Sequence, residues 1–166
     1  MAPRLLSAIA LLSAMTVSPA LAATIEGTWL TPTGSEITVT PCLQGFCGSL
    51  SWIVVPPEQA ALCSTFTPEE AAALMLDYKN PDRALQTRPL LGAELLTLAP
   101  QADGSYNARI YDVLKGETHD VTIWVNDDTL RLGAGCVMGM CAFTQDWPRA
   151  AMREAPGFTC DSPPPA

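Results

Sequence analysis

The sequence predicts an all-β fold: an eight-stranded antiparallel up-and-down β-barrel with one short helix in a long loop between strands three and four. Short runs of alternating apolar and polar residues recur with turn residues between them, as in a β-meander. The hexads Cys42–Cys47 and Cys136–Cys141 share a C-x4-C spacing with glycine fourth, and each lies between two strand-like runs. That pattern is typical of a β-hairpin pinned by a disulfide, with a backbone of positive φ at the glycine.

Eight strand-like runs follow one another, separated mostly by tight turns. They span residues 24–31, 35–41, 47–55, 93–99, 106–113, 119–125, 130–136 and 141–147. Eight antiparallel strands can close into a barrel that holds side chains or one small ligand. Closure also removes the exposed edges that a flat meander leaves open to aggregation. An open sandwich remains the alternative, and the barrel is favoured.

Two runs carry aromatic side chains. Whether these point into or out of the barrel determines what fills its interior. In the third run, Leu50, Trp52 and Val54 are expected on one face because side chains alternate along a strand. In the sixth run, Trp124 is expected opposite the apolar face that carries Ile123. Core filling is the ordinary role of such aromatics, and lining a cavity is the alternative.

The segment 56–92 interrupts the strand pattern. Thr67 suits an N-cap, Pro68 the first helical position and Glu70 the capping-box position, and the alanine-rich run 69–76 is expected to be helical. A connection this long inside a compact meander is usually functional or a lid. We therefore expect it to cover or rim one mouth of the barrel.

The chain begins with the features of a secretory signal peptide, residues 1–23. Arg4 precedes an apolar run, and a small-x-small pattern places the cut after Ala22 or Ala23. The apolar run is too short for a stable membrane span, so no membrane anchor is expected. One barrel domain, 24–160, and a disordered proline-rich tail, 161–166, follow. The expected location is the periplasm or the extracellular medium.

The chain is acidic. Nine basic and seventeen acidic residues give a formal net charge of −8. Removal of the leader, which holds one basic residue and no acidic one, changes it to 8 − 17 = −9. Such a surface repels nucleic acid and anionic lipid, so neither is expected as a partner.

Six cysteines, all beyond the leader, form an even set suited to an oxidising compartment. Residues that face each other across an antiparallel ladder lie close enough for a disulfide, which favours Cys42–Cys47 and Cys136–Cys141. The remaining pair, Cys63–Cys160, would tie the long loop to the C-terminal segment. A four-thiolate zinc site is the less favoured alternative, so no metal is expected.

The run Asp77-Tyr-Lys-Asn-Pro-Asp82, continuing through Arg88-Pro-Leu-Leu-Gly92, resembles the central motif of a bacterial exported family, domain-of-unknown-function family 2147. The resemblance extends from Gly27-Thr-Trp29 to the segment that ends at Trp147. One departure is Gln86, where the family is expected to carry arginine. The resemblance implies a lipocalin-like (calycin) barrel and brings no established activity with it.

The first and last strands carry a second likeness to lipocalins. Gly27-Thr-Trp29 resembles the G-x-W on the first lipocalin strand, over whose tryptophan a basic residue from near the end of the barrel packs. Here Arg149 is the matching residue. A guanidinium on an indole face contributes about 0.5–2 kcal/mol, and it would cap the closed end of the barrel.

No residue pattern amounts to a catalytic site, and neither a cofactor nor an enzyme activity is expected. His119 is the only histidine. No serine or cysteine lies in a nucleophile motif, so a catalytic role would depend on this one imidazole at a strand start. A surface or turn histidine is the favoured interpretation.

The candidates for ligand binding are polar groups that could gather at a barrel mouth, together with two aromatic residues on strands. They are Trp52, Asp77, Asn80, Asp82, Arg88, Tyr111 and Asp112. The alternative is that the Asn-Pro-Asp run satisfies turn amides and that the arginine pairs locally.

The leading hypothesis is an exported protein that binds a small apolar or amphipathic ligand inside the barrel. The alternative is a structural or protein-interaction module of the envelope with a filled barrel and an unknown partner. An enclosed apolar void of a few hundred Å³ would favour the first.

Overall fold

The computed structural model describes residues 24–59 and 61–160, so the expected signal peptide and tail lie outside the described part. Its strands are β1 (Gly27–Leu30), β2 (Glu36–Cys42), β3 (Gly45–Val54), β4 (Glu94–Pro100), β5 (Tyr106–Asp112), β6 (Glu117–Asn126), β7 (Thr129–Val137), β8 (Met140–Ala150) and β9 (Gly157–Thr159). Between β3 and β4 lie the 3-10 turns η1 (Pro57–Gln59) and η2 (Arg83–Leu85) and the helices α1 (Ala61–Thr65) and α2 (Pro68–Leu74).

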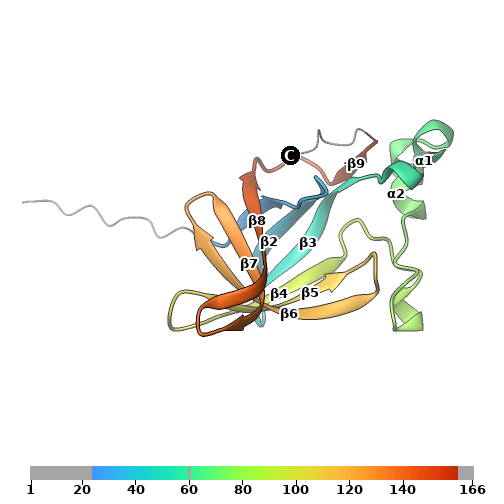
Figure 1. The fold of residues 1–166 in the computed structure, drawn as a ribbon. Coiled ribbons are helices and arrows are strands. Elements are labelled where there is room, and N and C mark those ends of the chain that lie inside the picture. Colours follow the sequence, from blue (N-terminus) through green and yellow to red (C-terminus); the bar gives the residue numbers. More distant parts are fainter. Residues whose placement is uncertain (1–23, 60, 161–166) are drawn as a thin grey trace, which may run out of the picture.

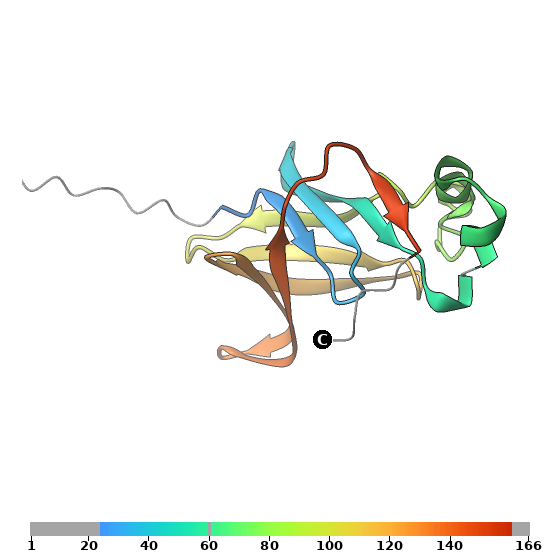
Figure 2. The same cartoon turned by 90° about the horizontal axis from the view of Figure 1, so that it is seen from above.

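The first eight strands form a closed ring. The hydrogen-bonded order is β2-β1-β8-β7-β6-β5-β4-β3, and β2 also pairs with β3, which closes the ring. All of these pairings are antiparallel. The predicted barrel is therefore confirmed. The long excursion lies beside one mouth of the ring, and the turns of β4–β5 and β6–β7 lie at the opposite end (Figures 1 and 2).

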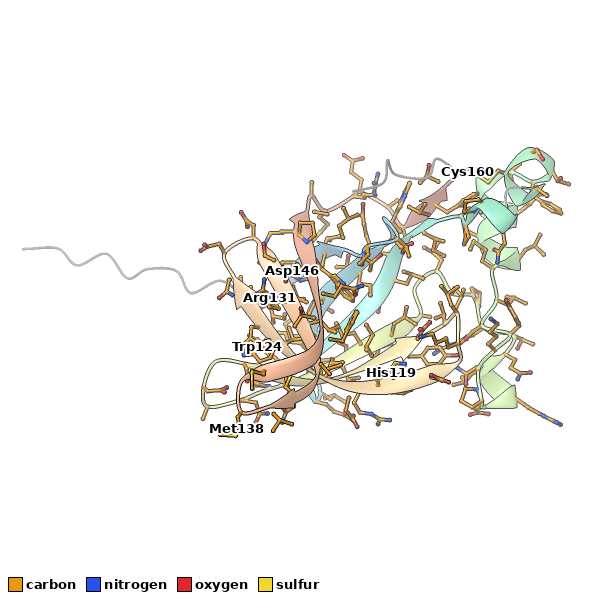
Figure 3. The ribbon with its side chains drawn as sticks, in the orientation of Figure 1. His119, Trp124, Arg131, Met138, Asp146 and Cys160 are labelled. Atoms are coloured by element: carbon orange, nitrogen blue, oxygen red, sulfur yellow. A yellow bond between two sulfur atoms is a disulfide. The ribbon has the colours of Figure 1, made fainter. Side chains whose placement is uncertain are left out.

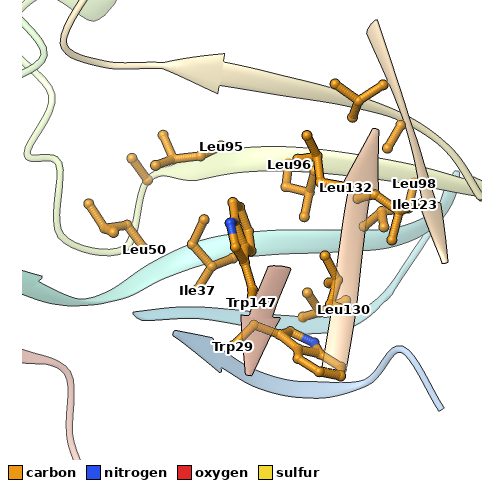
Figure 4. Packing of buried hydrophobic residues seen from close by; sticks show 14 of the residues in the cluster. Trp29, Ile37, Leu50, Leu95, Leu96, Leu98, Ile123, Leu130, Leu132 and Trp147 are labelled. Atoms are coloured by element: carbon orange, nitrogen blue, oxygen red, sulfur yellow. The ribbon is translucent and has the colours of Figure 1, made fainter. Parts of the chain in front are cut away.

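The end of the barrel away from the excursion is filled with side chains. Trp29 is fully buried and Arg149 stacks on its ring, with the guanidinium carbon 4.1 Å from the ring centroid. The same guanidinium donates to the backbone oxygens of Thr24 and Glu26. Figure 4 shows Trp29 against Leu130. The predicted cap over the first strand is thus present.

Both disulfide-bonded hairpins are confirmed, but they differ in register. Cys136 faces Cys141 directly across the ladder, with Cα atoms 3.8 Å apart. Cys42 instead faces Gly45, so its bond to Cys47 runs diagonally across the hairpin at a Cα separation of 5.8 Å. The fourth residue of each hexad has positive φ, 123° at Gly45 and 80° at Gly139.

A β-bulge in β3 corrects the expected facing of Trp52. Ile37 pairs with Leu50 and Glu36 pairs with Trp52, so Ser51 faces no residue of β2 in the ladder. The extra residue reverses the alternation, so Leu50 and then Ile53 are buried and Trp52 lies on the other face.

Beyond the bulge, the C-terminal residues 151–160, here called the strap, take the place of β4 along the edge of β3. The short strand β9 runs parallel to Trp52–Val54, where β4 no longer accompanies β3. Arg153 forms a bidentate ion pair with the buried Glu36 and stacks 3.9 Å from the Trp52 ring centroid. The sequence did not predict this ninth strand.

The excursion is held by a covalent bond and by a well-formed helix cap. Thr67 accepts from the backbone of Glu70, and Glu70 accepts from the backbone of Thr67, which confirms the predicted capping box of α2. Cys63 of α1 is bonded to Cys160, as predicted. No helix among the described residues is long and apolar enough to cross a membrane.

The seam between β6 and β7 opens toward the excursion end. β6 pairs with β5 from Glu117 onward, but it pairs with β7 only from Thr122, which faces Gly133. Residues 134–143 of the β7–β8 hairpin, here called the arm, pair only with each other. Met138 lies at its tip in Figure 3. The arm therefore leaves a gap beside the start of β6.

Candidate functional site

The half of the barrel nearer the excursion is hollow. A cavity of about 750 Å³ opens there. Its apolar wall comes from seven strands (β2 to β8), whose lining side chains include Ile37, Leu50, Leu95, Ile110, Val121, Leu132 and Trp147. A volume of this size lies within the range of small-molecule sites, about 300–1,000 Å³. The cavity has the volume and the apolar wall that the ligand-binding hypothesis requires, but it is open at its mouth and not the enclosed void that the sequence analysis named.

Trp147 forms the boundary between the filled and hollow halves. It is 2% exposed and lines the cavity, while its register partner Leu130 is fully buried. Figure 4 shows its ring beside Ile37. Its indole nitrogen donates to Oε1 of Gln145 at 2.8 Å. The floor of the cavity thus presents an aromatic face and an oriented amide.

The rim of the cavity carries its charged groups. Lys115 lies 3.6 Å from Asp112, and His119 lies 3.7 Å from Glu117. The imidazole is 44% exposed in its side chain and stands on the same strand face as Val121, two residues further along. His119 is therefore an exposed residue, as the sequence predicted, and it lies at the rim of the cavity.

Asp77 is the centre of a buried polar cluster beside the mouth. Its Oδ2 accepts from Asn80 Nδ2 at 2.7 Å and from Arg88 Nε at 3.0 Å, and its Oδ1 accepts from the Tyr111 hydroxyl at 2.7 Å. Arg88 Nη2 adds an ion pair at 2.9 Å, and the carboxylate side chain is fully buried. Four of the predicted site residues thus meet, with Tyr111 contributed by β5 and the others by the excursion.

Tyr111 is both a member of this cluster and part of the cavity wall. Burial, followed by its hydrogen bond to Asp77 and the negative charge of that carboxylate, raises the pKa of Tyr111 to about 12. The hydroxyl therefore stays protonated and donating at physiological pH. The cluster fastens the excursion to the barrel across 34 residues of sequence.

Other predicted residues serve local turns. Asp82 caps η2 by accepting from the Ala84 amide. Asp112 accepts from the amides of Leu114 and Lys115 in the β5–β6 turn. Asp112 also lines the cavity rim, whereas Asp82 does not.

Trp52, Asn80 and Arg88 lie outside the cavity wall. Gln86, which departs from the family pattern, donates to the backbone oxygen of Asn80. The Asn-Pro-Asp run is thus a structural turn that supports the mouth.

Sequence reasoning did not single out Gln145, and it treated Trp147 only as the end of a strand. A signal was present, because Phe143, Gln145 and Trp147 alternate along the last run and therefore share one face. A polar residue between two aromatics on an inward face indicates an oriented polar group.

The excursion lies next to the mouth. A smaller hollow of about 310 Å³ lies between the two, lined by Met75, Leu76 and Leu90 of the excursion. It shares Thr33 and Leu114 with the main cavity. The excursion thus borders a hollow next to the mouth, but none of its residues lines the main cavity, so its role as a cover or rim stays a prediction.

The family follows from a comparison with family models. Residues 27–149 match the model of DUF2147, described as "Uncharacterized protein conserved in bacteria". The chain belongs to this family. No curated protein matches the chain.

Among solved structures, the chain is similar to protein HP1028 from the human pathogen Helicobacter pylori, which is described as belonging to the lipocalin family. The TM-score is 0.58 at 17% sequence identity, over 78% of this chain and 85% of that one. The likeness shows the fold, which is lipocalin-like as the sequence resemblance implied.

Three disulfides in a member of a bacterial family indicate a compartment outside the cytoplasm, where disulfides persist.

Proposed function

We propose that this protein binds a small apolar or amphipathic molecule in the hollow half of its barrel and works as a non-enzymatic binding protein. The supporting observation is the cavity of about 750 Å³, whose wall is mainly apolar and whose charged groups lie at the mouth. Apolar ligands enter such a site because their transfer from water is favourable, by about 25 cal/mol per Å² of buried apolar surface. A filled interior, which the structural-module alternative requires, is found only in the other half.

The proposal includes export to the periplasm or beyond it. The signal-peptide pattern of residues 1–23 supports it, with cleavage after Ala22 or Ala23. A binding protein in that compartment meets its ligand outside the cytoplasmic membrane, and the three disulfides suit those conditions.

The test is a titration with N-phenyl-1-naphthylamine, a neutral apolar dye whose emission rises in apolar surroundings. We expect saturable binding near one dye per protein. The variant Ala134→Trp places an indole in the cavity wall, and it should weaken dye binding about tenfold or more, because the space for the dye is lost.

Ala142→Trp is the matched control. Ala142 belongs to the same arm, is exposed and does not line the cavity, so its variant should bind the dye like the parent protein. Thermal unfolding of all three proteins establishes that each is folded. Equal binding by the Ala134→Trp protein, or no saturable binding by the parent, contradicts the proposal.

A further inference from the structure

Gln145 stands in the middle of the cavity wall. It lies on β8 opposite Leu132, which also lines the cavity, and two residues before Trp147, so both side chains point inward. Its side chain is partly buried. It is the one carboxamide in the wall of this cavity.

The orientation of this amide follows from its neighbour. The Trp147 nitrogen lies 2.8 Å from Gln145 Oε1. An indole N–H can only donate, so the atom that faces it must be the oxygen of the amide. Because Trp147 is 2% exposed and packed in the floor, the amide cannot turn over without losing that bond. The NH₂ group is therefore fixed on the side away from Trp147.

Among the described residues, none accepts a hydrogen bond from that NH₂ group. Its surroundings in the cavity include Ile37 and Leu132, which offer no acceptor. A donor in an apolar site is stabilised by any acceptor that reaches it, and leaving it unmatched costs free energy. An apolar ligand without an acceptor would displace water from this group and leave it unmatched.

The charged groups at the rim indicate which acceptor group a ligand can carry. One ammonium, Lys115, lines the cavity and lies 3.6 Å from Asp112, whereas the Asp120 side chain is exposed on the other face of β6 and lies 3.7 Å from Arg109. The whole chain is acidic, at −8. A carboxylate ligand would therefore meet an ammonium that is already paired, in a chain of negative net charge, and an ammonium ligand carries only donors and could not accept from Gln145.

We infer that the cavity selects uncharged acyl compounds, such as ketones, esters or amides with an apolar chain, and that Gln145 determines this specificity by donating to the carbonyl oxygen. The inference rests on the proposed ligand-binding function and names the ligand class of the same cavity. The apolar chain then lies against the wall formed by Leu50 and Leu95.

Four probes of equal carbon count test the head group: butyrophenone, butylbenzene, 4-phenylbutanoate and 4-phenylbutylamine. Each competes with N-phenyl-1-naphthylamine for the parent protein. One hydrogen bond to an otherwise unmatched donor should make butyrophenone bind about five- to tenfold more tightly than butylbenzene. The two charged probes should bind more weakly than the ketone.

Two variants assign the preference to Gln145. Gln145→Met removes the amide and keeps an apolar chain of similar length, so the ketone preference should disappear while butylbenzene still binds. Gln145→Glu keeps an acceptor for the Trp147 nitrogen but removes the donor, so it should lose the ketone preference and favour 4-phenylbutylamine. Near-ultraviolet circular dichroism checks that the tryptophan surroundings are kept.

The two proposals fail in different ways. Saturable binding of the dye and of butylbenzene without a ketone preference, or a preference that survives in Gln145→Met, overturns the assignment of Gln145 and leaves the binding function standing. Tightest binding of 4-phenylbutanoate overturns the uncharged ligand class. Absence of saturable binding by the dye and all four probes overturns both proposals.

Discussion

The two halves of the barrel share the same strands but differ in their interior. The half away from the excursion, here called the closed half, is filled with side chains, and the half nearer the excursion, here called the open half, contains the cavity. In the closed half, Trp29, Leu98, Ile123 and Leu130 are at most 2% exposed, and Arg149 covers the outermost tryptophan. In the open half, the inward side chains leave about 750 Å³ unfilled. The difference shows that the closed half provides the hydrophobic core that stabilises the fold, so the open half can keep a cavity.

The open half compensates for its missing core by other bonds. Asp77 joins the excursion to β5 through a fully buried carboxylate, and the Cys63–Cys160 disulfide ties the excursion to the strap. The hydrogen bonds of Asp77 and the disulfide fix the position of the excursion without filling the cavity beside it. The mouth is therefore held in place without side chains that fill the cavity.

The largest expected effect comes from the closed half. Trp29→Ala removes a fully buried side chain and should lower the free energy of unfolding by about 4 kcal/mol, because burial is lost and a cavity remains. Phe143→Ala is the counterpart in the open half. Phe143 is 54% exposed, so its replacement should cost less than about 1 kcal/mol. Urea denaturation followed by far-ultraviolet circular dichroism measures both, and equal losses would contradict the division into two halves.

The next effect concerns the cluster that holds the mouth. Asp77→Ala leaves the Arg88 guanidinium, the Asn80 amide and the Tyr111 hydroxyl without their common acceptor, and it should cost about 3 kcal/mol. The control is Asp120→Ala, whose ion pair with Arg109 spans 3.7 Å between exposed side chains and should be worth at most about 1 kcal/mol. If both variants unfold at the same urea concentration, Asp77 does not fasten the excursion.

The smallest effect is a dependence of stability on alkaline pH. The folded pKa of Tyr111, about 12, lies above the usual value near 10, so the folded state favours the protonated hydroxyl. The stabilisation is complete below pH 10 and is lost as the pH rises from about 10 to 12, and because solvent reaches this partly buried ring and screens its interactions, the loss should be on the order of 1 kcal/mol. Tyr111→Phe should be less stable at neutral pH and should show a smaller decrease over this range. A parallel decrease in both proteins would show that another group is responsible.

Local patterns in the sequence foretold most of the fold. Period-two alternation located the eight barrel strands, and the cysteine spacing located both hairpins. The likeness to the first and last lipocalin strands predicted that Arg149 stacks on Trp29. These features depend on neighbours in sequence or on a whole-chain resemblance, which is why they could be anticipated.

What escaped prediction depends on three-dimensional contacts. The single extra residue Ser51 turned Trp52 outward, and no sequence signal marks that bulge. The strap strand β9 has three residues, too few for a periodic pattern, and pairs with β3 far away in the chain. Asp77 and Tyr111 meet across 34 residues. The cavity itself is an absence of side chains, which no residue pattern encodes directly.

The central claim is that the barrel is hollow at the excursion end and filled at the other. A crystal of the protein soaked with bromobenzene tests it directly, because bromine is located by its anomalous scattering and small aromatics occupy apolar cavities. We expect bromine inside the barrel between Leu50 and Leu132, above Trp147, and none between Trp29 and Leu130. Side chains that fill the space between Leu50 and Leu132, or bromine only on the outer surface, would contradict the claim.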